Sequence, residues 1–306
     1  MNRELKFDLS VETNALLCPN PQEFYSKAYI TPDVVDNFRT LPGIKSATKL
    51  ANVLFTNTLT ASTCNFSTTN EQLDATDIDV CAVSALGEIC RFDIEQSFLS
   101  MQMAAGSNGS FEVASFMSYY WDEMSKEIES EVEQIRWRGE STGSTNTFLD
   151  LCDGYEVKLD ANTSVIDVAA TAVTVSSVLF EMTRVVNALP AVLKAKRGDL
   201  RFFVSPSIAL NFEIAAAQGN TMSFITQSLG LSFLGIKVVV AEGMSDGKMV
   251  LTNKSNLVYA FDAEGDSKAL KAVNLEDSIA EPKLRTRANL KIGFHLVNPD
   301  EIVYYS

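Results

Sequence analysis

The sequence predicts an α+β fold, and three observations lead to this prediction. The segment 249–306 contains strand-like runs separated by polar turns. The segment 110–138 has the apolar spacing of one long helix. The segment 43–95 has two strand-like stretches on either side of a polar tip. None of the three segments contains a set of side chains typical of catalysis.

The size and charge of the chain limit its function. It has 306 residues, enough for one large domain or two smaller ones. Its apolar fraction is 46% and its charged fraction 21%, so it can bury an ordinary core. The formal net charge is −14. Nonspecific DNA binding depends on a basic surface, so this chain is unsuited to gripping DNA, although it could enclose it.

The cysteines and the apolar runs indicate a cytosolic type of protein. The five cysteines are odd in number, irregularly spaced and without a C-x-x-C motif, which predicts free thiols and neither a disulfide framework nor a zinc site. The N-terminus lacks the apolar core of a signal peptide. No apolar run approaches the ~18 residues of a membrane span, so no membrane association is expected.

The first part of the chain predicts an arm and a ribbon. Residues 1–42 are polar and rich in proline, which fits an arm on another surface or an ordinary irregular N-terminus. Residues 49–55 and 78–92 are strand-like, and 56–76 are rich in Ser, Thr and Asn, which favour turns. A two-stranded ribbon is marginal alone. From the residues alone, the favoured interpretation is that the ribbon packs on the domain of its own chain.

The longest predicted helix has one continuous apolar stripe. Its apolar positions are three or four residues apart and begin at Val113. The opposite face is rich in glutamate, which we interpret as a solvated face and not as an acid–base site. The predicted core positions of this helix are Met117, Trp121, Met124, Ile128, Val132 and Ile135.

Beyond residue 165 the pattern is α/β and then β. A helix is predicted over 173–189, ended by Pro190, and a second helix begins at Pro206, where proline suits the first turn. The predicted strands are 200–204, 234–240, 249–252, 253–262, 285–297 and 301–306.

Catalytic and metal-binding motifs are missing from the sequence. His295 is the only histidine, which excludes a site with several histidines and leaves a structural strand residue as the better interpretation. No P-loop, dinucleotide fingerprint or G-x-S-x-G occurs. Ser205-Pro206-Ser207 lacks the glycines of a nucleophile elbow. We therefore expect no catalytic residue, no cofactor and no metal site.

Several motifs occur together in a recognisable order. Ile135-Arg136-Trp137-Arg138-Gly139 ends the long helix, and Phe148-Leu149-Asp150-Leu151 follows a Ser/Thr/Gly loop. The run 199–206, ending in Ser-Pro, and the strand 253–262 come later. In this order the motifs resemble tailed-phage major capsid proteins of the Hong Kong 97-like fold. The resemblance covers about residues 110–306, and the part before it matches only in organisation.

The resemblance implies a fold in four parts. In this family the ribbon at 43–95 is an extended loop that reaches over a neighbouring subunit. The resemblance therefore implies that the ribbon packs between subunits and not on its own domain. The implied parts are an N-terminal arm at 1–42, an extended loop at 43–95, a peripheral domain at 96–160 and 281–306 with a spine helix at 110–138, and an axial domain at 161–280.

The implied function is that of a major capsid protein. Such a protein forms pentamers and hexamers of an icosahedral shell around a phage dsDNA genome, without sequence-specific DNA binding. It is assembled in the host cytoplasm, becomes part of the virion, and meets a portal and scaffold or decoration proteins. The polar tip has no lysine, so cross-linking is not predicted. The extended-loop residues expected at subunit interfaces are Leu50, Val53, Phe55, Val80 and Val83.

Two alternatives stay open. Encapsulins, bacterial nanocompartment shells that load an enzyme, share the fold. An uncharacterised α/β enzyme is the less favoured choice, because the phosphate, metal and histidine motifs are missing.

Overall fold

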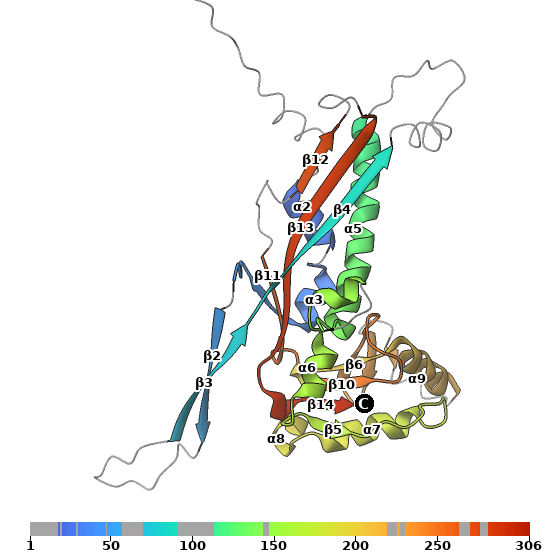
Figure 1. The fold of residues 1–306 in the computed structure, drawn as a ribbon. Helices are drawn as coiled ribbons and strands as arrows, with labels where there is room; N and C mark the ends of the chain where they lie inside the picture. Colours follow the sequence, from blue (N-terminus) through green and yellow to red (C-terminus); the bar gives the residue numbers. More distant parts are fainter. Residues whose placement is uncertain are drawn as a thin grey trace, which may run out of the picture. The chain divides into compact units, whose positions relative to one another are not determined.

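The computed structural model describes most of the chain, and the described part forms two compact units (Figure 1). Unit 1 consists of 1–36, 82–133 and 262–291, and unit 2 of 37–81, 134–261 and 292–306. The described residues are 18, 20–28, 30–46, 48–56, 70–90, 113–142, 147–218, 225–226, 230–262, 270–275 and 281–306.

Unit 1 is a small sheet with helices on one face. The antiparallel pair β12–β13 aligns Leu270 with Ala288, and β4 also pairs with β13. On the covered face, the hydroxyl of Tyr120 in α5 lies 2.8 Å from that of Thr286 in β13. The elements are α2 (Pro21–Ala28), α3 (Pro32–Asn37), β4 (Cys81–Cys90), α5 (Val113–Arg138), β12 (Leu270–Asn274) and β13 (Lys283–Leu296), of which α3, β4, α5 and β13 continue into unit 2.

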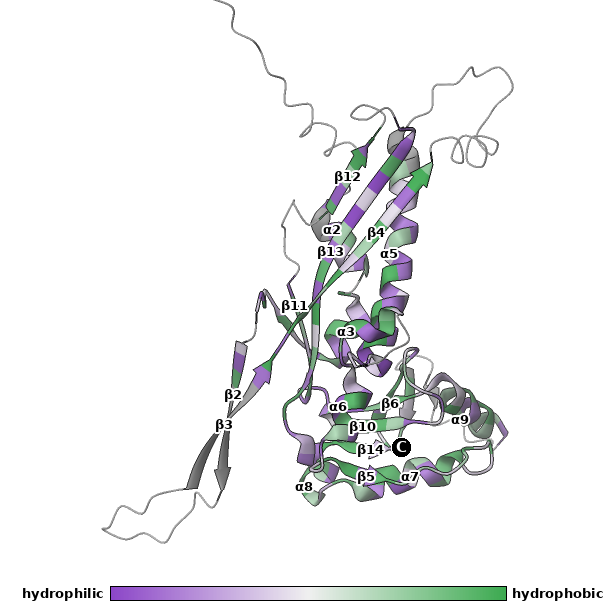
Figure 2. Ribbon diagram, in the orientation of Figure 1, coloured by the Kyte–Doolittle hydropathy of each residue, from purple (hydrophilic) through white to green (hydrophobic). Residues whose placement is uncertain are grey.

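The helix α5 is stabilised by the packing of its apolar stripe against other elements. Along it, hydrophobic and hydrophilic residues alternate at helical spacing (Figure 2). In unit 1, Trp121 packs edge-on against Phe24 of α2, with ring centroids 5.3 Å apart. Of the predicted stripe, the buried residues are Met117, Trp121, Ile128, Val132 and Ile135, and Met124 is half-buried.

Unit 2 is built on a seven-stranded sheet with the order β5-β14-β10-β6-β9-β8-β7. The central strands are buried on both faces: all five residues of β6 except Arg201 are fully covered. The strands are β5 (Ile166–Val168), β6 (Leu200–Val204), β7 (Ile225–Thr226), β8 (Gly230–Phe233), β9 (Ile236–Val240), β10 (Met249–Asn253) and β14 (Val303–Tyr305).

Helices complete the core of unit 2. The buried side of α7 and that of α9 join the sheet in one hydrophobic cluster, to which Met182, Phe212 and Tyr305 belong. Pro206 begins α9, as its sequence predicts. The helical elements are η1 (Phe148–Leu151), α6 (Tyr155–Ala161), α7 (Val178–Ala188), α8 (Ala191–Ala195), η2 (Arg197–Asp199), α9 (Pro206–Gln218) and η4 (Pro299–Glu301).

A second sheet region of unit 2 carries the ribbon. β1 (Arg39–Pro42) pairs in parallel with β11 (Leu257–Asp262), and β11 also adjoins β13. The ribbon consists of β2 (Thr48–Thr56) and β3 (Asn70–Ile78), antiparallel over nine residue pairs. At its root, Ile78 packs with Val258 and Ala260.

The structure corrects the predicted course of the ribbon. The prediction placed the returning strand at 78–92 and a polar tip at 56–76. The returning strand is instead β3, and 81–90 forms β4 in the other sheet. Strand formation by β3, which contains Asn, Glu and two Asp among its nine residues, follows from its ladder with β2, which outweighs its own low β-propensity. The N-terminal arm also differs, because α2 and α3 are helical. The short helix expected at 94–103 lies outside the described residues.

The prediction of free thiols was wrong for two cysteines. Cys81 and Cys152 form a disulfide across a sequence separation of 71 residues. Their Cα atoms are 5.9 Å apart, which the fold brings about and the spacing of the cysteines could not indicate. Cys18 and Cys90 are free, and Cys64 lies outside the described residues.

Candidate assembly surfaces

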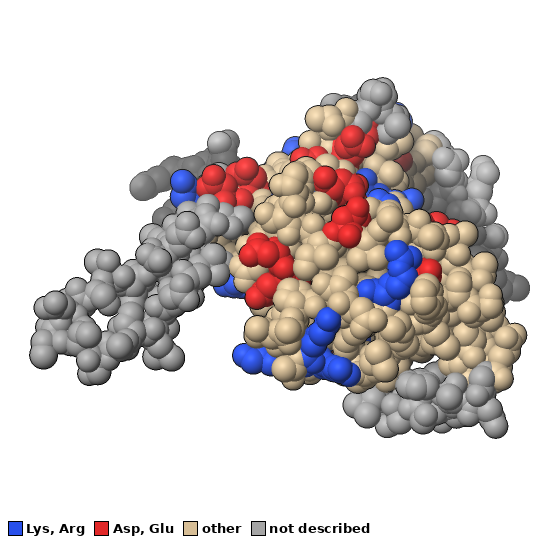
Figure 3. Space-filling view, turned by 90° about the horizontal axis from the view of Figure 1, so that it is seen from below, with Lys and Arg blue, Asp and Glu red and all other residues tan. Residues whose placement is uncertain are grey.

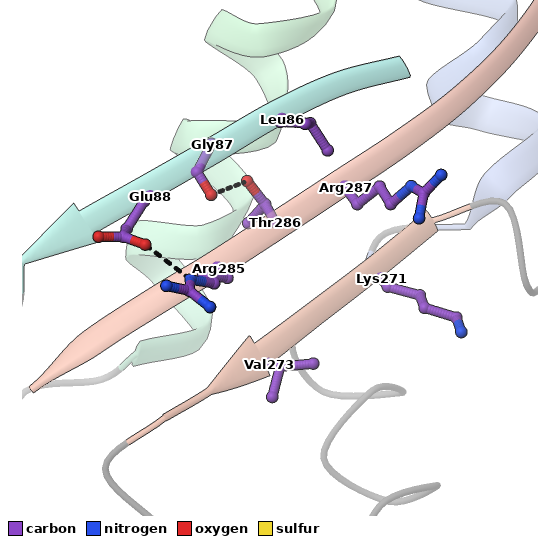
Figure 4. Close-up of a pocket in the computed structure, with 8 residues that line it drawn as sticks. All are labelled: Leu86, Gly87, Glu88, Lys271, Val273, Arg285, Thr286 and Arg287. Atoms are coloured by element: carbon purple, nitrogen blue, oxygen red, sulfur yellow. Dashed lines mark hydrogen bonds and ion pairs between the residues drawn. The ribbon is translucent and has the colours of Figure 1, made fainter. Parts of the chain in front are cut away.

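A shallow groove lies on the uncovered face of the sheet in unit 1 (Figure 4). It has a volume of about 480 Å³ and is lined by side chains of β4, β12 and β13. Leu86 is 72% exposed and Val273 is 46% exposed, so apolar surface faces solvent here. Exposed apolar surface rimmed by charges is typical of a protein contact.

The rim of this groove is mostly basic, although the whole chain is acidic. Glu88 binds Arg285 at 2.6 Å and Lys283 at 2.8 Å, and these two cations lower the pKa of its carboxyl group. Lys271 and Arg287 lie on the same face and form no ion pair within the described residues. The solvent face of α5 in the same unit carries carboxylates such as Glu127 and Glu131, and burial and Glu127 raise the pKa of Glu131.

Unit 2 exposes a second set of apolar side chains on its helices. Val192 of α8 is 70% exposed, Phe180 of α7 is 65% exposed, and Leu210 of α9 is 58% exposed. Figure 3 looks at the molecule from below the view of Figure 1, the side on which α7 and α8 lie. Uncharged residues make up most of the described surface there. Exposing such apolar side chains to water is unfavourable, so covering them with another chain stabilises the assembly.

Within unit 2, the root of the ribbon is held to the rest of the unit by several independent contacts. The N–H of Asp79 donates to Nε2 of His295 at 3.1 Å, and the carbonyl oxygen of Asp79 lies 2.8 Å from the same nitrogen. A Cβ at Gly293 would collide with that carbonyl oxygen, so only glycine permits the close approach. The Cys81–Cys152 disulfide adds a covalent link beside these contacts.

His295 is a packing residue in this arrangement. Burial and the neighbouring Lys158, whose Nζ is 3.5 Å from Nδ1, lower the pKa of His295 to about 4. The ring is therefore neutral near pH 7. The structural role predicted for this histidine agrees with its buried position.

One buried polar trio in unit 2 has the composition of an acid–base site. Nζ of Lys248 lies 3.0 Å from Glu156 and 2.6 Å from the hydroxyl of Tyr304. Burial alone lowers the pKa of Lys248, but its bonds to Tyr304 and Glu156 outweigh this and raise it. Burial raises the pKa of Tyr304 to about 12 despite the bond from Lys248. At neutral pH neither Lys248 nor Tyr304 is a base, so the trio links α6, the turn before β10, and β14, and has no evident chemistry.

The described residues contain no group of three or more His, Cys, Asp or Glu side chains placed to hold a metal ion. Among the helices of the described part, none has the length and apolar character to cross a membrane.

The predicted interface residues are distributed over three places. Leu50 and Val80 pack against the cluster around Ile78, so they contribute to the core of their own chain. Val53 and Phe55 lie farther along β2, and Val83 lies in β4. A role for these residues between subunits stays a prediction.

Comparison with solved structures decides which fold this is. The capsid of an empty GTA particle is 12% identical and matches with a TM-score of 0.54, covering 92% of this chain and 89% of that one. The satellite phage P4 procapsid with its size determination (Sid) protein is 10% identical with a TM-score of 0.58, covering 93% and 96%. The chain has the fold of phage capsid proteins. This capsid fold is the Hong Kong 97-like fold that the motifs predicted.

The capsid fold also occurs in a related kind of particle. A virus-like particle from Pyrococcus furiosus is 8% identical with a TM-score of 0.55, covering 98% of this chain and all of the other. No protein-family model matches the sequence. A search of curated proteins found no match either. At identities of 8–12% the similarity lies in the order and arrangement of the elements and much less in particular residues.

Proposed function

We propose that this protein is a major capsid protein, which assembles into pentamers and hexamers of an icosahedral shell around a phage dsDNA genome. The end-to-end similarity to capsid subunits carries the proposal. It accounts for exposed apolar residues in both units, because a shell subunit is covered by its neighbours. The role is structural, and no step of it needs a catalytic residue.

The same proposal assigns tasks to the parts of the chain. The ribbon in 43–95 reaches over a neighbouring subunit, and residues 161–280 form the axial domain at the centre of a capsomer. The arm at 1–42 and the peripheral domain at 96–160 and 281–306 complete the subunit. Its net charge of −14 suits a wall that encloses DNA without binding it. A portal and scaffold or decoration proteins are the further partners, and the virion is the location.

Electron microscopy of the purified protein tests the proposal directly. Shells, sheets or capsomers are the expected result. Uniform monomers at high protein concentration would contradict it.

The ribbon gives a sharper test. Val53→Asp places a charge in β2, away from the packed root, and we expect a folded subunit that assembles poorly, because the charge would be desolvated in a subunit contact. Sedimentation measures assembly, and circular dichroism measures folding. Ser130→Asp, on the exposed polar face of α5, introduces the same charge as a control. Normal assembly of Val53→Asp would show that the ribbon is not an intersubunit element.

A nanocompartment shell of the encapsulin type is the second candidate. Its support is the virus-like particle from Pyrococcus furiosus, whose whole length matches this chain. The contents of native particles separate the two functions: packaged DNA supports the phage capsid, and a protein cargo supports the nanocompartment.

A further inference from the structure

The Cys81–Cys152 pair lies at a mechanically important point of unit 2. Cys81 begins β4 two residues after Asp79, where the chain leaves the ribbon strand β3. Cys152 follows η1 and comes shortly before α6. The disulfide therefore ties the root of the ribbon to the segment that follows the long helix α5.

The same place is already held without the disulfide. His295 contacts the backbone of Asp79, and Ile78 is packed in a hydrophobic cluster. Sγ of Cys152 lies 3.7 Å from the carbonyl oxygen of Ile292, a contact that a thiol can make as a donor. Opening the disulfide would thus leave the root in place.

The two cysteines differ in exposure. Cys152 is 3% exposed, whereas Cys81 is only partly buried. A small thiol or disulfide from solution therefore reaches Cys81 first, and Cys152 is the buried partner that completes the exchange. Thiol–disulfide exchange needs one cysteine that a reagent can reach and a second within bonding distance, and Cys81 and Cys152 meet both conditions.

We propose that Cys81 and Cys152 are a redox modification site, a reversible covalent lock at the root of the ribbon whose reaction partner is a low-molecular-weight disulfide such as glutathione disulfide. When the disulfide would close follows from the proposed shell function. In a reducing cytoplasm the pair stays as two thiols during assembly. After release into oxidising surroundings the pair closes, and the lock strengthens the finished particle.

The chemistry balances by thiol–disulfide exchange. The thiolate of Cys81 attacks one sulfur of glutathione disulfide, which breaks its S–S bond and releases one glutathione thiolate. The thiolate of Cys152 then attacks Sγ of Cys81, forms the protein disulfide and releases the second glutathione. The two cysteines lose two protons and two electrons in total, and glutathione disulfide gains both as two molecules of glutathione.

The other described thiols are less suited to this reaction. Burial raises the pKa of the Cys18 thiol although the backbone of Ala272 partly opposes this, which reduces its thiolate fraction. Cys90 is free and partly buried, and no second described cysteine is bonded to it. Exchange should therefore be selective for Cys81 and Cys152.

The test uses the full-length protein in two redox states. One half is reduced with a phosphine, the other is treated with excess glutathione disulfide, and free thiols are alkylated before peptide mapping. We expect Cys81 and Cys152 to be alkylated in the reduced sample and joined in the oxidised one. We also expect reduction to lower the midpoint of thermal unfolding by roughly 5–10 °C, as loss of a long disulfide loop does.

Variants check that this pair causes the shift. Cys81→Ser should unfold at the midpoint of the reduced protein with either reagent, whereas Cys90→Ser should keep the full redox shift. The wild-type comparison needs no variant, so a Cys81→Ser protein that failed to fold would leave the test intact.

Two results would overturn the lock. One is alkylation of both cysteines after treatment with glutathione disulfide, and the other is an identical unfolding midpoint in both redox states. Microscopy of the same samples keeps the two proposals apart. Shells that form but acquire no disulfide on treatment with glutathione disulfide would refute the lock alone, and a disulfide in a protein that never assembles would refute the shell function alone.

Discussion

The two units differ in where their charged side chains lie. Unit 2 buries charged side chains next to partners: Glu156 is 5% exposed beside Lys248, and Glu181 is 4% exposed beside Arg184 and Tyr305. Within the described part of unit 1, no charged side chain is buried. Most of its ion pairs, such as Lys27–Asp122 and Glu88–Arg285, are at least 40% exposed on both sides, whereas Lys291 and Asp262 of a further pair are 38% and 22% exposed.

Buried and exposed ion pairs have different consequences for a protein. A buried pair holds a fold together mainly because removing one partner leaves the other charge uncompensated. An exposed pair contributes little to folding, and its charges stay available to another molecule. We therefore expect the charges of unit 2 to matter for the stability of the subunit and those of unit 1 to matter for what the subunit meets.

A charge introduced into the core of unit 1 should be the most damaging of these changes. Ile128 is 4% exposed on the apolar stripe of α5. Ile128→Asp should prevent soluble folding, at a cost of at least about 4 kcal/mol, since the carboxylate would be buried without a partner. Soluble yield and circular dichroism measure this.

A control tests whether position or charge is responsible. Ser130→Asp adds the same charge on the exposed face of α5 and should fold normally. If Ile128→Asp folded as well as Ser130→Asp, the conclusion that the apolar stripe of α5 is packed in the core would be contradicted.

Removing one partner from the buried charge network of unit 2 should have the next largest effect. Glu156→Ala leaves Lys248 without its carboxylate and the N–H of Ser245 without its acceptor, 2.7 Å away in the native protein. We expect a loss of about 3–5 kcal/mol in the free energy of unfolding, measured by urea titration of the subunit. Asp160→Ala is the matched control, because Asp160 is 55% exposed and 3.8 Å from the same lysine. Equal losses in both variants would contradict a special role for burial.

Acidification should weaken unit 2 through His295. Its pKa of about 4 in the folded protein lies below the ordinary 6.5, so the unfolded chain binds the proton more tightly. Its contribution to stability is therefore complete above pH 6.5 and is lost as the pH falls toward 4, by on the order of 2–3 kcal/mol. Carboxylates add their own pH dependence, so the comparison is with His295→Gln, in which this component should vanish. The same slope in both proteins would show that His295 does not carry it.

The sequence predicted most long elements because their apolar periods are strong. The stripe of α5 and the buried runs of β6 and β10 needed no knowledge of neighbours, and these predictions are confirmed. The strand β3 was missed because its own residues favour turns, and only its pairing with β2 makes it a strand.

Features that depend on distant residues could not be predicted. The pairing of Cys81 with Cys152 depends on the approach of two segments that only the folded chain brings together. The groove likewise depends on three strands, β4, β12 and β13, meeting in one sheet. The capsid fold was predicted from the order of weak motifs, since the order of elements persists at identities near 10%.

The smallest expected effect is the removal of an exposed charge from unit 1. Glu88→Gln abolishes the ion pairs to Lys283 and Arg285, but water screens all three side chains, so we expect no measurable change in the unfolding midpoint of the isolated subunit. Its consequence should appear in assembly, as an altered dependence of shell formation on salt, because screening acts on contacts between exposed charges. Light scattering across a salt series measures this. A loss of subunit stability similar to that of Glu156→Ala would mean that the exposed charges of unit 1 hold its fold, and the contrast between the two units would fail.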